Sequence, residues 1–141
     1  MRVLVMALFA AACASAPTPP ANERVAGCWI DRGQNRTVTM RWLRGGEPGI
    51  LNGQLLEYGM TGAISRRASY TLAPRDGRWT LCEVGAVREE SQCYAVAEGD
   101  TGSLEGGRVF IDSHREELRI AVVGANGARE VLFDGRRDGC D

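Results

Sequence analysis

The sequence has no lysine and only one histidine, His114, among its 141 residues. All 17 basic residues are arginine, they face 18 acidic residues for a net charge of −1, and the two signs alternate along the chain without forming blocks. Nucleic-acid-binding proteins usually carry a basic tract, which this pattern lacks. The P-loop, the dinucleotide-binding glycine pattern and the Gly-x-Ser-x-Gly motif are also missing. We therefore expect no nucleic-acid partner, no cofactor and no enzymatic activity.

Long apolar runs are missing apart from one near the N-terminus, VLVMALFAAA at residues 3–12. This run is too short to span a bilayer. It lies between Arg2 and a group of small residues, which is the layout of an export signal. We predict a signal peptide over residues 1–14, a flexible tether rich in proline and alanine over residues 15–24, and a single domain over residues 25–141.

Two processing routes fit this signal. The segment Ala10-Ala11-Ala12-Cys13 resembles the lipobox of bacterial lipoproteins, in which the cysteine is lipidated and becomes the new N-terminus. Ala10 departs from the resemblance, because that family usually has Leu, Val or Ile there. The alternative is cleavage before Ser15, which gives a plainly secreted protein. We expect lipidation of Cys13 and a periplasmic protein anchored to the outer membrane, in contact with the membrane only through its lipid.

Both routes remove Cys13 from the folded domain and leave four cysteines. An even number of cysteines in an exported chain predicts two disulfides, which can be drawn with three connectivities. Cys82 and Cys93 flank a short polar segment and fit the two arms of one hairpin, which leaves Cys28 to pair with Cys140. A metal site is not expected, because the four thiols lack CxxC spacing and His114 has no partner histidine.

From Val25 onward, short apolar or alternating runs are separated by Gly, Asp and Asn at intervals of roughly ten residues. Val38, Met40 and Trp42 fall on one face of such a run, and Asn126-Gly127 is a strong hairpin signal. The pattern predicts an all-β fold, a small antiparallel up-and-down barrel of about eight to nine strands. A β-sandwich is the alternative.

The first predicted strand contains Gly27-Cys28-Trp29, and DGRRDGC near the end of the chain supplies Arg136 and Arg137. A Gly-x-Trp on the first strand resembles the lipocalin superfamily, in which the tryptophan packs across the barrel floor and an arginine from near the chain end lies against it. The resemblance implies a lipocalin-like barrel that binds a small hydrophobic molecule. The chain departs from that pattern in being shorter and in lacking a clear C-terminal helix.

One motif has a catalytic association: DTGS at Asp100 to Ser103 resembles the Asp-Thr-Gly of aspartic proteases. Those enzymes hold the aspartate at the end of a buried apolar strand, so that two carboxylates share a proton. Here the motif lies in a glycine-rich segment, which is typical of a surface turn. His114 lies in a charged segment, where a solvated side chain is expected. We predict no catalytic residue.

Several aromatic side chains fall on predicted strands at positions that can face inward; as ligand-binding candidates we list Trp29, Trp42, Tyr70, Trp79 and Phe133. They either fill the core, as in a small barrel, or line a pocket for an apolar ligand. Arg66 falls on the same predicted face as Ile64, Ala68, Tyr70 and Leu72. An arginine there either marks a polar ligand group or means that this face is outside.

These patterns predict a non-catalytic, monomeric envelope protein that binds a small hydrophobic molecule. The alternative is a periplasmic interaction or enzyme-inhibitor module that presents a loop to a partner protein. The candidate loops are EVGAVREESQ at residues 83–92 and EGDTGSLEGG at residues 98–107.

Overall fold

The computed structural model describes residues 17–85, 92–97 and 107–140, which form one short helix and nine strands. The signal region, Cys13 and the DTGS motif lie outside the described residues, as do most of the two candidate loops. The elements are α1 (Ala21–Val25), β1 (Gly27–Arg32), β2 (Arg36–Arg44), β3 (Leu51–Gly59), β4 (Ile64–Arg75), β5 (Arg78–Glu83), β6 (Cys93–Val96), β7 (Arg108–His114), β8 (Glu117–Val123) and β9 (Arg129–Asp138).

The strands form a closed barrel in chain order, in which β1 pairs with β9 as well as with β2. The predicted all-β barrel is therefore confirmed. One pair departs from up-and-down topology: β6 and β7 run parallel, with Ala95 opposite Arg108 and Val96 opposite Val109. A parallel pair needs a connection that returns the chain to the same end of the sheet, and the glycine-rich sequence between these strands carries no periodic signal of one.

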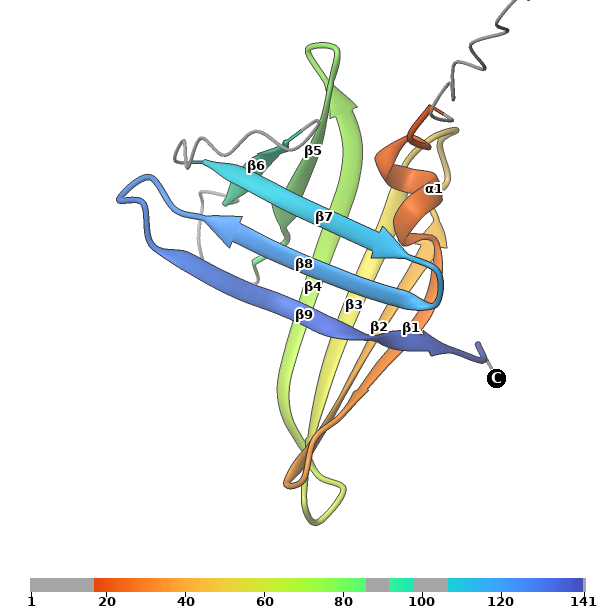
Figure 1. Cartoon of the computed structure of the whole chain (residues 1–141), viewed down its shortest axis with the longest axis vertical. Helices are drawn as coiled ribbons and strands as arrows, with labels where there is room; N and C mark the ends of the chain where they lie inside the picture. Colours follow the sequence, from red (N-terminus) through yellow and green to blue (C-terminus); the bar gives the residue numbers. More distant parts are fainter. Residues whose placement is uncertain (1–16, 86–91, 98–106, 141) are drawn as a thin grey trace, which may run out of the picture.

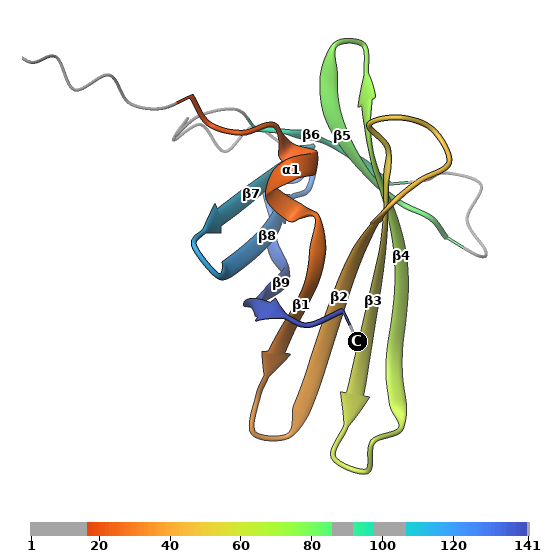
Figure 2. The ribbon, with the colours of Figure 1, turned by 90° about the vertical axis from the view of Figure 1, so that its right-hand side faces the viewer.

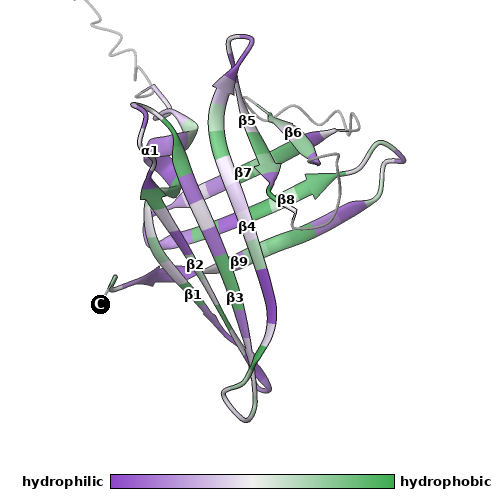
Figure 3. Cartoon of the chain, turned by 180° about the vertical axis from the view of Figure 1, so that it is seen from behind, coloured by the Kyte–Doolittle hydropathy of each residue, from purple (hydrophilic) through white to green (hydrophobic). Residues whose placement is uncertain are grey.

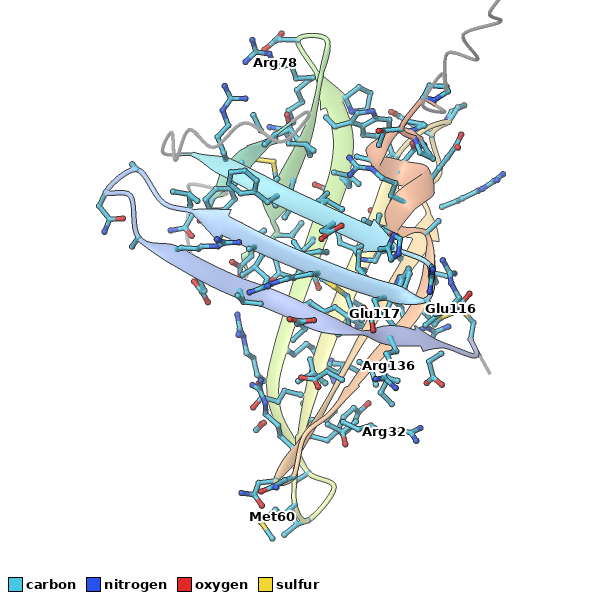
Figure 4. All side chains as sticks on the ribbon, in the orientation of Figure 1. Arg32, Met60, Arg78, Glu116, Glu117 and Arg136 are labelled. Carbon is cyan, nitrogen blue, oxygen red and sulfur yellow. A yellow bond between two sulfur atoms is a disulfide. The ribbon has the colours of Figure 1, made fainter. Side chains whose placement is uncertain are left out.

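Two groups of strands cross in the barrel (Figure 1). The long strands β1 to β4 run along the length of the molecule, and β7 to β9 cross them at a steep angle. Figure 2 shows α1 at one end of the long strands, with the β1–β2 and β3–β4 turns at the other. Met60 in the β3–β4 turn is 81% exposed and marks that far end (Figure 4).

Four of the five residues of helix α1, residues 21–24, belong to the predicted flexible tether. Ala21 and Val25 are spaced four residues apart, lie on one side of the helix and are both buried. Their burial in the hydrophobic core fixes the end of the tether against the barrel. None of the helices among the described residues is long and apolar enough to cross a membrane.

Alternation along the strands sends large apolar side chains into the barrel. Val38, Met40 and Trp42, which were predicted to share one face, are all buried on β2. Figure 3 shows the hydrophobic end of β8, where burial does not alternate because Ile120–Val123 are all buried. On β4, Ala68, Tyr70 and Leu72 are buried, whereas Ile64 of the same predicted face is 47% exposed. A bulge separates Ile64 from them, because Tyr58 pairs with Ile64 and Glu57 with Arg66, which leaves Ser65 as an extra residue in between.

Both predicted disulfides are present. Cys28–Cys140, with Cα atoms 5.3 Å apart, joins β1 to the chain just beyond β9 at the seam that closes the barrel. Cys82 and Cys93 lie directly opposite each other on β5 and β6, with Cα atoms 4.1 Å apart. Such bonds indicate an oxidising compartment outside the cytoplasm.

Trp29 on β1 is buried, and Arg137 on β9 lies against its ring. The Trp29 ring is 1% exposed, its Nε1 donates to the Val25 carbonyl at 2.8 Å, and Arg137 Cζ lies 4.2 Å from the ring centroid. This is a favourable distance for a cation–π contact. Arg136, the other candidate, is exposed beside Glu117 on the neighbouring strand (Figure 4).

Candidate ligand-binding site

The five aromatic residues predicted as ligand-binding candidates do not form one site. Trp29, Trp42, Tyr70 and Phe133 are each at most 2% exposed and belong to the hydrophobic core, whereas Trp79 is half-buried at its edge. The middle of the barrel is therefore filled by side chains, as expected for a small barrel.

Trp42 shows how tightly this centre is packed. Its ring lies across the backbone of Gly53 on β3, where an added Cβ would meet ring carbons at 2.6 to 2.8 Å. The Tyr70 ring lies beside it, with ring centroids 6.4 Å apart. The glycine opposite Trp42 leaves the space that the indole occupies, so this volume is not available to a ligand.

A cavity with a volume of about 700 Å³ lies at the side of the barrel. We call it the lateral pocket. It lies beside α1, between the chain leading into this helix and strands β5 to β9, and it is lined by Thr18, Pro19, Pro20, Ala21, Arg24, Trp79, Val96, Ala97, Phe110, Ile111, Asp112, Arg119, Ala121 and Arg129.

The lateral pocket exists because β6 is too short to cover β7. Strand β6 pairs with β7 only as far as Val109, so the edge of β7 beyond that point has no strand partner on this side among the described residues. Helix α1 packs there instead (Figure 1), and Arg24 donates from a terminal guanidinium nitrogen to the Ile111 carbonyl at 2.6 Å. A helix side chain thus satisfies a backbone acceptor that a strand would otherwise pair with.

The apolar wall of the lateral pocket comes from both faces of the sheet. Phe110 and Ile111 are neighbours on β7 and so point to opposite faces, yet both line the pocket. The pocket therefore spans the free edge of β7, with Trp79 and Val96 on the inner side and Ala121 beside Phe110 on the outer side.

The charged groups of the lateral pocket are three arginines and one carboxylate, Asp112. Arg119 Nε lies 3.6 Å from Asp134, whereas Arg129 forms no ion pair with any residue that the structure describes. Arg24 Nε is buried without a hydrogen-bond partner. The surplus of guanidinium groups beside an apolar wall suits a ligand that has an apolar body and an anionic head.

Sequence reasoning found Trp79 but missed the rest of this pocket. Phe110 carries a usable signal, since it alternates with Val109 and Ile111 and must face away from the core. Arg24 and Arg129 carry none, because their proximity depends on α1 and on the parallel β6–β7 pair.

Of the residues considered for catalysis or metal binding, the structure describes those within residues 17–85, 92–97 and 107–140. His114 ends β7 and is exposed, as the sequence predicts for a solvated side chain. In these ranges no three His, Cys, Asp or Glu side chains cluster as metal ligands.

Comparisons with protein-family models, with curated proteins and with solved structures found no match. The function is therefore inferred from the geometry of the chain itself.

Proposed function

We propose that this protein is an exported, non-catalytic binding protein for a small amphiphilic molecule, and that the lateral pocket holds the ligand. The observation that carries the proposal is the pairing of an apolar wall, formed by Trp79, Val96, Phe110 and Ile111, with a surplus of arginine. A volume of about 700 Å³ also falls within the range of small-molecule sites. The filled centre of the barrel favours this site over a central one.

The affinity can be estimated for a ten-carbon fatty acid. Complete burial of its chain contributes about 8 kcal/mol, and the loss of overall motion on binding costs at least about 4 kcal/mol. A charge-assisted hydrogen bond between an arginine and the carboxylate adds about 2 kcal/mol. The balance is about −6 kcal/mol, which corresponds to a Kd on the order of tens of micromolar.

The proposed lipidation of Cys13 would bring the lateral pocket close to a membrane. Thr18 lines the pocket and follows Cys13 by five residues. A fully extended chain of that length spans at most about 18 Å. An amphiphile partitioned into the bilayer surface would then meet the pocket without crossing the periplasm, which supports an amphiphilic ligand.

The test is a head-group series on the mature protein with Cys13→Ser, which prevents lipidation. An environment-sensitive fatty-acid probe is bound and then displaced by decanoate, decanol or decylamine, which share one chain length and differ in charge. We expect saturable probe binding and displacement in the order decanoate, decanol, decylamine. A lack of saturable binding would contradict the proposal, and so would preferential displacement by decylamine.

Two variants locate the site. Arg129→Ala should weaken decanoate binding about thirtyfold through loss of a charge-assisted contact of about 2 kcal/mol, and Trp79→Ala should weaken binding of all three compounds through loss of apolar surface. Arg32→Ala is the matched control, because Arg32 is exposed on β1 and does not line the pocket (Figure 4). Equal affinities in Arg129→Ala and Arg32→Ala would exclude the lateral pocket as the head-group site.

A further inference from the structure

A smaller cavity lies between β4, β5, β6, β8 and β9, where Arg66, Gln92 and Glu130 are exposed, and it shares no lining residue with the lateral pocket. We call it the polar cavity. Its volume is about 80 Å³, roughly that of three water molecules. Its polar lining comes from Arg66, Tyr70, Glu83, Gln92, Tyr94 and Glu130. Any occupant must therefore be small and polar.

The Tyr70 hydroxyl is a buried group that is directed at this cavity. Tyr70 is 2% exposed, and its hydroxyl oxygen has no hydrogen-bond partner. Burial first, and then the Glu83 carboxylate, raises the pKa of Tyr70 to about 12, so the hydroxyl stays neutral and can both donate and accept. Glu83, Arg66 and Glu130, which act electrostatically on this hydroxyl, all line the polar cavity. A buried hydroxyl without a partner is costly unless a bound group satisfies it.

Charges of both signs line the polar cavity. Arg66, Glu83 and Glu130 form no ion pair with any residue in the described part of the chain. The Tyr94 hydroxyl, by contrast, already has a partner, since it lies 3.3 Å from Gln92 Oε1 and can donate to it. The groups left for an occupant are one guanidinium, two carboxylates and the Tyr70 hydroxyl.

We propose that the polar cavity binds a small zwitterion, a molecule that carries an ammonium and a carboxylate a few atoms apart. The ammonium would donate to Glu83, Glu130 and the Tyr70 oxygen, and the carboxylate would accept from Arg66. A simple cation would leave Arg66 unpaired and be repelled by it, and a simple anion would be repelled by both carboxylates. A zwitterion satisfies both signs.

The experiment compares three probes of similar size: glycine, methylamine and acetate. Each is titrated into the full mature protein while the ring resonances of the three tyrosines are followed by NMR. We expect glycine to shift the Tyr70 resonances saturably, and methylamine and acetate to bind at least tenfold more weakly. Equal binding of glycine and methylamine would reduce the cavity to a cation site and overturn the proposal. Absence of any saturable shift would mean that the cavity holds only water and would overturn it as well.

Variants then test each contact. Tyr70→Phe removes the hydroxyl and keeps the ring; because that hydroxyl has no partner, the fold should survive while glycine binding weakens at least fivefold. Arg66→Gln and Glu83→Gln should each weaken glycine binding at least tenfold. Arg67→Gln is the control, since Arg67 follows Arg66 on β4 and points to the other face. If Arg67→Gln weakens glycine binding as much as Arg66→Gln does, the assignment of Arg66 is wrong.

The two proposals can fail separately. Arg66, Tyr70 and Glu83 lie outside the lateral pocket, and Arg129 and Trp79 lie outside the polar cavity. Displacement of the fatty-acid probe by decanoate should be unchanged in Arg66→Gln, and glycine titration should be unchanged in Arg129→Ala.

Discussion

The disulfide between Cys28 and Cys140 should stabilise the fold more than the disulfide between Cys82 and Cys93, because it closes a much longer loop. The two bonds span 112 and 11 residues along the chain. In the loop-entropy model, closing loops of these lengths contributes about 4.8 and about 2.8 kcal/mol. Replacing the first pair with alanine should therefore lower the free energy of unfolding by about 2 kcal/mol more than replacing the second pair.

The two disulfides also differ in what lies beside them. Strand β1 meets β9 through three register pairs, Cys28 with Asp138, Trp29 with Arg137 and Ile30 with Arg136, and β5 meets β6 through three as well. The first disulfide lies next to the buried Trp29 at the seam that closes the barrel, whereas the second joins β5 and β6. Loss of the seam disulfide should thus expose Trp29 sooner during unfolding.

Urea denaturation followed by far-UV circular dichroism and by tryptophan fluorescence measures both effects. The comparison uses Cys28→Ala with Cys140→Ala against Cys82→Ala with Cys93→Ala, each with the other disulfide intact. Unfolding must be two-state in both proteins for the free energies to be compared. Equal losses, or a larger loss in the hairpin variant, would refute the loop-entropy reasoning for this domain.

Three further predictions concern the core, the pH response and the N-terminus. Gly53→Ala should lower stability in thermal unfolding by about 1 to 3 kcal/mol, because the new methyl group would meet the Trp42 ring at 2.6 Å. Gly46→Ala is the control and should be neutral, because its methyl group would meet nothing within 4 Å. Equal losses of stability in the two variants would contradict the packing described. The pKa of Tyr70 is about 12 in the folded state against 10.0 for an ordinary tyrosine, so the stability that its neutral hydroxyl contributes is fully present below pH 10 and is lost as the pH rises to 12, by up to about 3 kcal/mol. Urea unfolding of wild type and of Tyr70→Phe at pH 9 and pH 11.5 measures this loss. If the free energy of unfolding falls equally in both proteins between these pH values, the prediction is wrong. The intact mass of the mature protein should show a diacyl addition at Cys13, and an unmodified mature chain would mean plain secretion.

Most of the fold could be predicted because it rests on local signals. Alternation placed Val38, Met40 and Trp42 inside, and the positions of four cysteines in an exported chain led to the correct pairing. The first feature depends on the pattern of neighbouring residues, and the second depends on the number and positions of the cysteines. Neither needs knowledge of contacts between distant segments.

The candidate sites could be predicted only in part, because they depend on contacts between distant segments. Helix α1 is five residues long and too short to be stable alone; it forms because Ala21 and Val25 are buried against the barrel. The lateral pocket depends on that helix and on the parallel β6–β7 pair. Arg66 was predicted to share a face of its strand with Tyr70, with both an inward and an outward face left open. It lines a cavity beside Tyr70, but the partners across this cavity come from β5 and β9.

The strand alternation that builds the core also separates the two proposed sites. Ala121 lines the lateral pocket and Val122 lines the polar cavity, and the neighbouring pair Arg129 and Glu130 is divided in the same way. Because successive residues of a strand point to opposite faces, β8 and β9 present an arginine-rich face to one site and a carboxylate to the other. A shift of one residue in the β8–β9 register would exchange these faces. The bulge between Ile120 and Ala121 sets this register, so it determines which charges each site receives.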